Sequence, residues 1–363
     1  MSTYEQAGVQ GQSDALSSVV RHLGPTLGLP QDGEVLTSFG GYASIVKVSD
    51  DLAIAITTDG VGSKTIVAAA LDRYDTIGFD CVAMNANDVI CVGARPIAMV
   101  DYLGVHTLHP GRADEILRGL GAAAKEAGLA IPGGELAQLP EVIGSDGTSP
   151  GDERAFDLVG TCIGVVDPTR IVTGAGIQAG DVLIGLNSSG IHSNGLTLAR
   201  KVLLGKAGYG LDEEIPRLGR TLGDELLEPT EIYVRAATAL WSSGIETKGM
   251  AHITSDGFAN LCRLDAPAGY TIEDLPPAPA IFGLIEEAGR IAASEMYRVF
   301  NMGIGLVIVV GHADAEAATA CVRGRGYEAR RIGTVTGDSG IVRVEPARLV
   351  GGMADGASHF EPY

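Results

Sequence analysis

Two parts of the chain share the same order of apolar and polar positions. In the first half, the apolar run 51–58 is followed by a glycine-rich turn and then by the helix-like segment 65–71. In the second half, the apolar run 181–186 leads into a turn rich in Ser, Gly and Asn and then into the amphipathic segment 196–204. Each stretch predicts a strand, a turn and a helix. The recurrence of this order predicts two α/β domains of similar plan.

The domain boundary is expected near Pro168, where the strand predicted at 158–166 gives way to a turn-rich stretch. In the first domain, residues 111–128 place apolar side chains at helical spacing and predict a helix. In the second, a buried strand is predicted at 306–310, and the residues from Gly351 onward are expected to form a loose tail. The chain is thus divided into an N-terminal segment, two domains and a tail, at residues 1–34, 35–168, 169–345 and 346–363.

Composition and charge narrow the class of protein. The 363 residues exceed what one core usually holds, and the 51 glycines, about twice the usual share, are typical of tight turns in α/β proteins. A net charge of −19 argues against a nucleic-acid-binding surface. Neither a membrane-spanning segment nor a signal peptide is expected from the apolar runs. The five widely spaced cysteines, without a CxxC motif, are expected to be reduced core residues of a cytoplasmic protein.

Carboxylates at the ends of predicted elements, or in apolar surroundings, give the strongest chemical signal: Asp59, Asp80, Asp88, Asp101 and Glu135. Asp101 lies within the apolar run 97–103, where an ionised carboxylate needs a cation or hydrogen-bond donors. Singly, each has a structural alternative, such as helix capping by Asp59 or an ion pair between Asp88 and Arg95. Together, without His or Cys neighbours, they predict a Mg²⁺ site, and Mg²⁺ usually bridges to nucleotide phosphates.

The turn at 59–64, Asp-Gly-Val-Gly-Ser-Lys, is interpreted as a phosphate-binding loop. Gly60 and Gly62 let backbone N–H groups approach phosphate oxygens, while Ser63 and Lys64 could supply a hydroxyl and a positive charge. The turn is not a Walker A loop, because GxxxxGK[ST] is absent. Taken alone, it fits a purely structural turn about equally well.

The second turn, at 188–195, brings serines, His192 and Asn194 together where a strand gives way to a helix. Ligands of open α/β sheets bind at such strand ends. His192 could act as an acid or base or bind a phosphate, and Asn194 could bind a carbonyl or amide. The alternative is a helix cap with a solvent-exposed histidine.

A third polar patch lies within residues 296–305. Arg298 and Asn301 precede two glycines and a predicted strand, and could face a cleft. The Met and aromatic residues around them are expected to belong to the core.

These three motifs, in this order and at these spacings, resemble the phosphoribosylformylglycinamidine cyclo-ligases, or aminoimidazole ribonucleotide synthetases. The resemblance covers nearly the whole chain, at residues 4–9, 58–64, 75–80, 82–88, 133–135, 188–195 and 296–305. The last two segments are specific in combination, whereas the glycine turn alone is shared by a wider ATP-dependent superfamily.

The resemblance implies an α/β (α+β) subunit of two αβ domains that forms a homodimer. The N-terminal sheet would pair with that of a second subunit into a closed barrel, and the ATP and substrate cleft would lie between the domains and at the dimer interface. The implied reaction belongs to purine biosynthesis. ATP phosphorylates the amide oxygen of formylglycinamidine ribonucleotide, and the amidine nitrogen closes the imidazole ring with release of ADP and phosphate.

The same resemblance implies a role for each matching residue. The implied metal ligands are Asp59, Asp88, Glu135 and Asp80. The implied ATP contacts are Gly60, Gly62, Ser63, Lys64, Asp101, Gly133 and Gly134. The implied substrate contacts are Ser189, Gly190, His192, Ser193, Asn194, Arg298 and Asn301. Lys64 and His192 are the implied catalytic residues.

The sequence departs from the family pattern at two places. Leu136, Gln138 and Glu141 stand where the pattern has Thr, an acid and Gly, and Ser255-Asp256 interrupts a run of glycines. These changes affect the expected substrate and nucleotide contacts but leave the class of enzyme unchanged. The alternatives are a thiamine-phosphate kinase-like enzyme of the same superfamily and a non-catalytic nucleotide-binding homologue.

Overall fold

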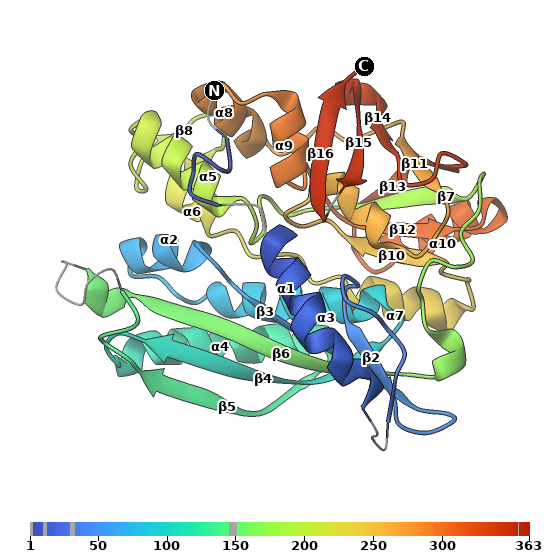
Figure 1. The fold of residues 1–363 in the computed structure, drawn as a ribbon. Helices are drawn as coiled ribbons and strands as arrows, with labels where there is room; N and C mark the ends of the chain where they lie inside the picture. Colours follow the sequence, from blue (N-terminus) through green and yellow to red (C-terminus); the bar gives the residue numbers. More distant parts are fainter. Residues whose placement is uncertain (1–2, 10–12, 30–32, 145–150, 355) are drawn as a thin grey trace.

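The computed structural model describes residues 3–9, 13–29, 33–144, 151–354 and 356–363. Its two halves each contain a mixed sheet, as the repeated pattern predicts, and they lie one above the other (Figure 1). The N-terminal segment contributes helix α1 (Ser13–Leu23). No helix in the described ranges is long and apolar enough to cross a membrane.

The first half forms a six-stranded sheet in the order β1-β2-β3-β6-β4-β5, in which only β4 and β5 are parallel. Helices α2, α3 and α4 cover one face of this sheet (Figure 1). The strands are β1 (Glu34–Val35), β2 (Ser44–Lys47), β3 (Ala53–Gly60), β4 (Arg95–Val105), β5 (Ala130–Gln138) and β6 (Phe156–Val166). The helices are α2 (Lys64–Leu71), α3 (Ile77–Cys91) and α4 (Pro110–Ala127).

The second half forms an eight-stranded sheet in the order β10-β12-β7-β13-β11-β14-β15-β16. Its strands are β7 (Val182–Asn187), β10 (Gly249–His252), β11 (Gly269–Ile272), β12 (Ile304–Val310), β13 (Ala329–Thr336), β14 (Val342–Val344), β15 (Leu349–Ala354) and β16 (Ala357–Pro362). Its helices are α5 (Leu196–Arg200), α6 (Leu222–Leu226), α7 (Val234–Ser243), α8 (Ala280–Gly289), α9 (Ala293–Val299) and α10 (Ala315–Arg323). A separate two-stranded sheet joins β8 (Glu214–Ile215) to β9 (Arg220–Thr221).

Several predicted elements are confirmed. The helix expected at 111–128 is α4, which ends at Gly128 in the left-handed conformation that glycine favours, with φ +70°. The buried strand expected at 306–310 is part of β12, every residue of which is buried. The segment expected at 196–204 begins as α5 and continues as a π-helical stretch, Lys201–Lys206.

The expectation of a loose tail is wrong. Residues after 345 form β15 and β16, which pair antiparallel with each other, and β15 also pairs with β14. Leu349 and Phe360 are buried in the core of the second half. The sheet therefore continues to Pro362, because backbone pairing and these two apolar anchors compensate for a weak apolar pattern.

Helix α3 lies between the two halves. Every residue in it except Phe79 and Asp88 is buried. It packs against β3 and β6 of the first half and against β10 and α7 of the second. Its approach to α4 requires Gly78, where a Cβ would lie 2.0 Å from the backbone nitrogen of Leu120. Side chains from one helix can thus reach both sheets.

Candidate active site

Asn85 of α3 fixes the position of Asp59 at the end of β3. Its side-chain oxygen accepts a hydrogen bond from the Asp59 N–H at 3.0 Å, and its amide donates to the Asp59 carbonyl at 3.0 Å. The same amide donates to the Cys81 carbonyl at 2.9 Å. Asn85 is fully buried, so these bonds are shielded from water. The end of the strand is therefore tied to the helix that lies between the halves.

Asp59 and Asp88 form a carboxylate pair. Burial, followed by the charge of Asp88, raises the pKa of Asp59 to about 6. Asp88 is held in turn by His252, whose Nδ1 lies 2.9 Å from Asp88 Oδ1. The charge of Asp88 beside the buried Asp59 carboxylate fits a bound cation, which would relieve the repulsion.

This pair also limits the kind of metal site. In the part of the chain that the structure describes, no three carboxylate, imidazole or thiol groups converge into a ready-made metal site. Mg²⁺ commonly uses one or two protein carboxylates, with phosphate oxygens and water completing its shell. Asp59 and Asp88 fit that arrangement.

Asp101 and Glu135 lie on opposite faces of the first sheet. Asp59, Gly160, Asp101 and Gly134 are aligned across four neighbouring strands, so Asp101 shares the α3 face with Asp59. A Cβ at Gly134 would lie 2.4 Å from Asp101 Oδ1, which explains the glycine at that position. Glu135 is the next residue along β5 and points to the uncovered face. Within one chain, the structure does not bring Glu135 to Asp59 and Asp88.

Lys64 and Asp80 form a buried ion pair, with 2.8 Å between Lys64 Nζ and Asp80 Oδ1. Lys64 also donates to the Glu228 carbonyl. Asp80 Oδ1 accepts further hydrogen bonds from the Thr230 N–H at 2.9 Å, the Thr230 hydroxyl at 2.6 Å and the Ser193 hydroxyl at 3.1 Å. Both side chains are fully buried, so this network connects the two halves of the chain.

His192 is buried inside the second loop. Its Nε2 accepts a hydrogen bond from the Ser189 N–H at 3.2 Å, and its backbone has φ +63°. Burial, followed by the charges of His252 and Lys64, holds the pKa of His192 well below its usual range, so the imidazole is neutral. The alternative of a helix cap with a solvent-exposed histidine is therefore wrong. This imidazole has no contact with bulk water in the structure.

Asn301 holds the second loop in place. Its amide donates to the carbonyls of Gly190 at 2.9 Å and Ile191 at 3.2 Å. Its oxygen accepts from the Ser188 hydroxyl at 2.9 Å and from the Gly303 N–H at 2.8 Å. Because Asn301 is only 2% exposed, these bonds fix the loop from inside the protein.

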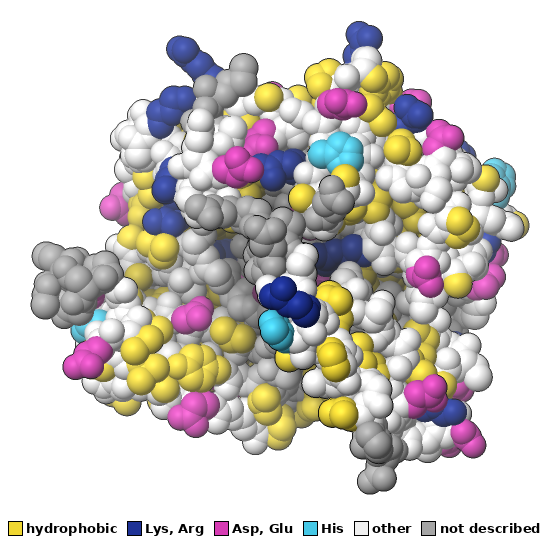
Figure 2. All heavy atoms as spheres, viewed as in Figure 1, with side chains coloured by type: hydrophobic (Ala, Val, Ile, Leu, Met, Phe, Trp, Pro, Cys, Tyr) yellow, Lys and Arg dark blue, Asp and Glu magenta, His cyan; other side chains and the backbone are white. Residues whose placement is uncertain are grey.

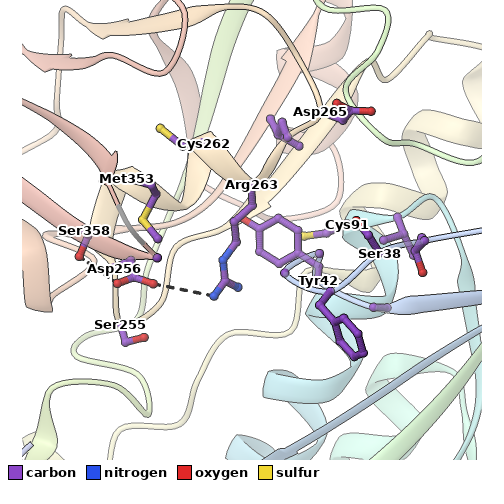
Figure 3. A pocket seen from close by; sticks show the side chains of 18 of the residues that line it. Ser38, Tyr42, Cys91, Ser255, Asp256, Cys262, Arg263, Asp265, Met353 and Ser358 are labelled. Carbon is purple, nitrogen blue, oxygen red and sulfur yellow. Dashed lines mark hydrogen bonds and ion pairs between the residues drawn. The ribbon is translucent and has the colours of Figure 1, made fainter. Parts of the chain in front are cut away.

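A cavity of about 930 Å³ includes some of the candidate residues in its lining. It is lined by the N-terminal segment, by the loop at 36–43, by residues 255–256 and 262–265, and by the end of the last hairpin. Figure 3 shows Ser38 and Tyr42 of the loop, Asp256 and Arg263, and Met353 and Ser358 of the hairpin around this cavity. Asn194 and Arg298 are the two predicted site residues that line it. Arg298 is bound to Glu295 through two hydrogen bonds of 2.8 and 2.9 Å.

The cavity and the carboxylate pair share one electrostatic environment. Arg263, which lines the cavity, offsets part of the rise in the pKa of Asp59 that burial and Asp88 cause. Burial raises the pKa values of Tyr42 and Cys91, and the charge of Asp88 adds to both shifts. Sequence reasoning did not identify Tyr42 or Arg263. The Gly40-Gly41 pair before Tyr42 was the available signal, since Gly40 has φ +102°.

Two family models match the sequence. The AIR synthase related protein, N-terminal domain, matches residues 40–166, and the AIR synthase related protein, C-terminal domain, matches residues 178–345. The phosphoribosylformylglycinamidine cyclo-ligase of Methanobrevibacter smithii is 46% identical over 343 residues, which cover 94% of this chain and 96% of that protein. That of Thermococcus kodakarensis is 46% identical over 349 residues, covering 95% and 98%.

Solved structures show the same fold at much lower identity. Thiamine-monophosphate kinase from Stenotrophomonas maltophilia K279a has a TM-score of 0.58 at 18% identity, covering 95% of this chain and 98% of that one. T. maritima PurL complexed with ADP has a TM-score of 0.54 at 15% identity over 85% of this chain, which spans only 44% of that longer one. These two matches concern the fold alone.

Proposed function

The chain belongs to the AIR synthase related family over both of its domains, and we propose that it is an ATP-dependent cyclo-ligase of purine biosynthesis. It converts formylglycinamidine ribonucleotide to 5-aminoimidazole ribonucleotide. The γ-phosphoryl group of ATP passes to the amide oxygen, leaving ADP. The amidine nitrogen then attacks the amide carbon. The bond between this carbon and the phosphorylated oxygen breaks, and phosphate leaves.

One observation carries this proposal at the level of the site. Asn85 fixes the backbone of Asp59, and His252 binds the carboxylate of Asp88. Arg263, which lines a cavity formed by both halves of the chain, acts electrostatically on the Asp59 carboxylate. This arrangement suits a reaction in which a metal-bound triphosphate must meet a second anionic substrate. Asp59 and Asp88 would hold Mg²⁺, which when bound offsets the charge of the reacting phosphates.

The other predicted residues fall into two groups under this proposal. Gly60, Gly62 and the backbone of Ser63 contribute to the phosphate contacts, since the Ser63 hydroxyl is bonded to that of Thr197 at 2.9 Å. Asn194 contacts the ribonucleotide from the cavity wall. Lys64, Asp80, Ser189, His192, Ser193 and Asn301 position these groups, because each is engaged in hydrogen bonds within the protein. Gly190 supplies a carbonyl to Asn301, and Arg298 anchors the N-terminal segment through Glu295.

The proposed dimer uses the uncovered face of the first sheet. Ile56, Val100 and Ile163 point away from α3 and are 39%, 45% and 36% exposed. In Figure 2, apolar side chains gather at the lower left, where Figure 1 places β4, β5 and β6. Pairing two such faces would bury this apolar surface and close a barrel. Gly133 and Glu135 lie on that face of β5, so they would act at the dimer interface.

The test is product formation. Purified protein, incubated with Mg²⁺, ATP and formylglycinamidine ribonucleotide, should release one ADP and one phosphate for each aminoimidazole formed. Thiamine monophosphate in place of the ribonucleotide should give no ADP above background. ADP formation with thiamine monophosphate would favour the kinase alternative, and no turnover with either would favour a non-catalytic homologue.

A further inference from the structure

The cavity contains a positively charged side chain whose hydrogen-bonding capacity is unused. Arg263 ends a 3₁₀-helical stretch, Gly257–Arg263, and its side chain is 31% exposed. Its closest charged partner is Asp256, with 3.8 Å between Arg263 Nη2 and Asp256 Oδ2. That distance is too long for a hydrogen bond. Within the ranges that the structure describes, the guanidinium donates no hydrogen bond to another residue.

The other arginine in the cavity differs in this respect. Arg298 donates two hydrogen bonds to Glu295, and Glu295 also accepts one from the Tyr4 N–H at 2.6 Å. The charge of Arg298 is thus balanced, and its fork of donors faces a protein carboxylate. Arg263 is the arginine whose donors are available to a ligand.

Arg263 is nevertheless held in a defined orientation. Its guanidinium carbon lies 5.4 Å from the centre of the Tyr42 ring, at a distance typical of a cation–π contact. Tyr42 is itself fixed, because its hydroxyl donates to the Asn260 carbonyl at 2.8 Å and its ring is buried. Figure 3 shows the guanidinium in the middle of the cavity, beside the Tyr42 ring and turned toward Asp256.

Asp256 does not neutralise this guanidinium as Glu295 neutralises Arg298. Its Oδ1 accepts a hydrogen bond from the Ser358 hydroxyl at 2.9 Å, and its Oδ2 makes only the long contact with Arg263. A planar guanidinium that is stacked on one face and free at its edge is suited to two parallel hydrogen bonds to a phosphate.

We propose that Arg263 binds a phosphate group of a nucleotide in this cavity, with Tyr42 orienting it. The cavity lining also carries the carboxylates of Glu5, Asp256 and Asp265, so the attraction is local and depends on this one guanidinium. The inference rests on the proposed function, which supplies two sources of phosphate, the ribonucleotide substrate and ATP.

The kinetic test is Arg263→Gln, with Arg343→Gln as the matched control. Arg343 is 40% exposed, is 3.3 Å from Asp338 and lies outside the cavity lining. Loss of a paired, charged contact should raise one KM by at least about 10-fold. A higher KM for the ribonucleotide assigns the contact to the substrate, and a higher KM for ATP assigns it to the nucleotide. If both KM values match those of the control, the inference is overturned.

For a second substitution, the inference predicts a change in KM of the opposite sign. Asp256→Asn removes a negative charge beside the phosphate and should lower the affected KM by about two- to threefold. If Arg263 and Asp256 were only a structural pair, both substitutions would weaken binding alike, and that result would overturn the inference. Arg263→Lys replaces Arg263→Gln if the latter unfolds, because it keeps the charge but loses the paired geometry.

A binding measurement separates this inference from the proposed function. Calorimetric titrations of the wild type and Arg263→Gln with ribose 5-phosphate, and separately with Mg²⁺ and a non-hydrolysable ATP analogue, require no turnover. One probe should bind the variant at least about 10-fold more weakly. Equal affinity for both probes, or no binding of either to the wild type, overturns the role of Arg263. Absence of aminoimidazole product overturns only the proposed function.

Discussion

The Lys64 ammonium lies 2.8 Å from Asp80 Oδ1, and both side chains are fully buried where the two halves of the chain meet. Lys64 begins α2 and Asp80 belongs to α3, but the remaining partners, Ser193, Glu228 and Thr230, come from the second half. The pair therefore fixes the halves relative to each other. Removal of one charge leaves the other desolvated and without its counter-ion.

Asp80→Asn should lower the free energy of unfolding by about 3 kcal/mol, because it leaves the Lys64 ammonium buried without a carboxylate. Urea denaturation measures this change. The control is Asp50→Asn, which breaks the exposed ion pair with Lys47 and should change stability by less than about 1 kcal/mol. Similar small effects for both variants would contradict the role given to the buried pair.

Asp59→Asn should reduce turnover at least ~100-fold, which corresponds to roughly 2.7 kcal/mol at the transition state. The reason is that the proposed metal site would lose one of its two carboxylate ligands. The fold should persist, since Asn85 binds the backbone of residue 59 and not its carboxylate. Steady-state rates and circular dichroism test the two parts. Asp51→Asn, at an exposed position before β3, serves as the control. Unchanged turnover would remove Asp59 from the metal site.

His192 should make folding sensitive to acid. In the unfolded chain a histidine takes up a proton near pH 6.5, whereas in the folded chain the pKa of His192 is held well below that value by burial. The unfolded state thus binds more protons below about pH 6.5, and the free energy of unfolding falls as the pH falls. The loss attributable to this residue approaches about 1.4 kcal/mol per pH unit.

The measurement is urea unfolding between pH 7.5 and 5.5 for the wild type and His192→Asn. Asparagine tolerates the positive φ of this position and does not titrate. The variant should therefore lose less stability over this pH range. Parallel profiles would mean that the imidazole is protonated in the folded chain.

Ile163→Asp should convert the proposed dimer to a monomer. Ile163 lies directly opposite Ile56 on the uncovered face of the first sheet, so a carboxylate there would be buried without a partner in the dimer. Light scattering coupled to gel filtration gives the mass in solution. Leu117→Asp is the control, since Leu117 is 52% exposed on α4, which covers the other face. A dimer that survives Ile163→Asp would place the interface elsewhere.

Much of the local structure followed from the sequence because it depends on local spacing. The helix at 111–128 and the strands before the two polar loops have clear periodicity. The contact between Tyr42 and Arg263 does not depend on local spacing, since it joins segments more than 200 residues apart in the chain. No local pattern could identify that pair.

The sequence also did not show to which face of the sheet each strand side chain points. Glu135 follows a glycine pair, as expected of an acidic metal ligand, but only the register of β5 on β4 shows that it lies across the sheet from Asp59. Nor did the sequence show which polar side chains are buried. Lys64 and His192 have the residue types of catalytic groups, yet both are enclosed and bonded within the protein. The sequence predicted candidate segments but not the direction of each side chain.

The position of α3 has a consequence for how the protein unfolds. Because this helix has almost no surface exposed to solvent and contributes to both cores, neither half can open without uncovering it. Separation of the halves would also expose Asp80 and the backbone groups that Asn87 binds, the Glu231 carbonyl and the Tyr233 N–H. Heating should therefore melt both sheets in one cooperative transition, although the chain is built from two domains.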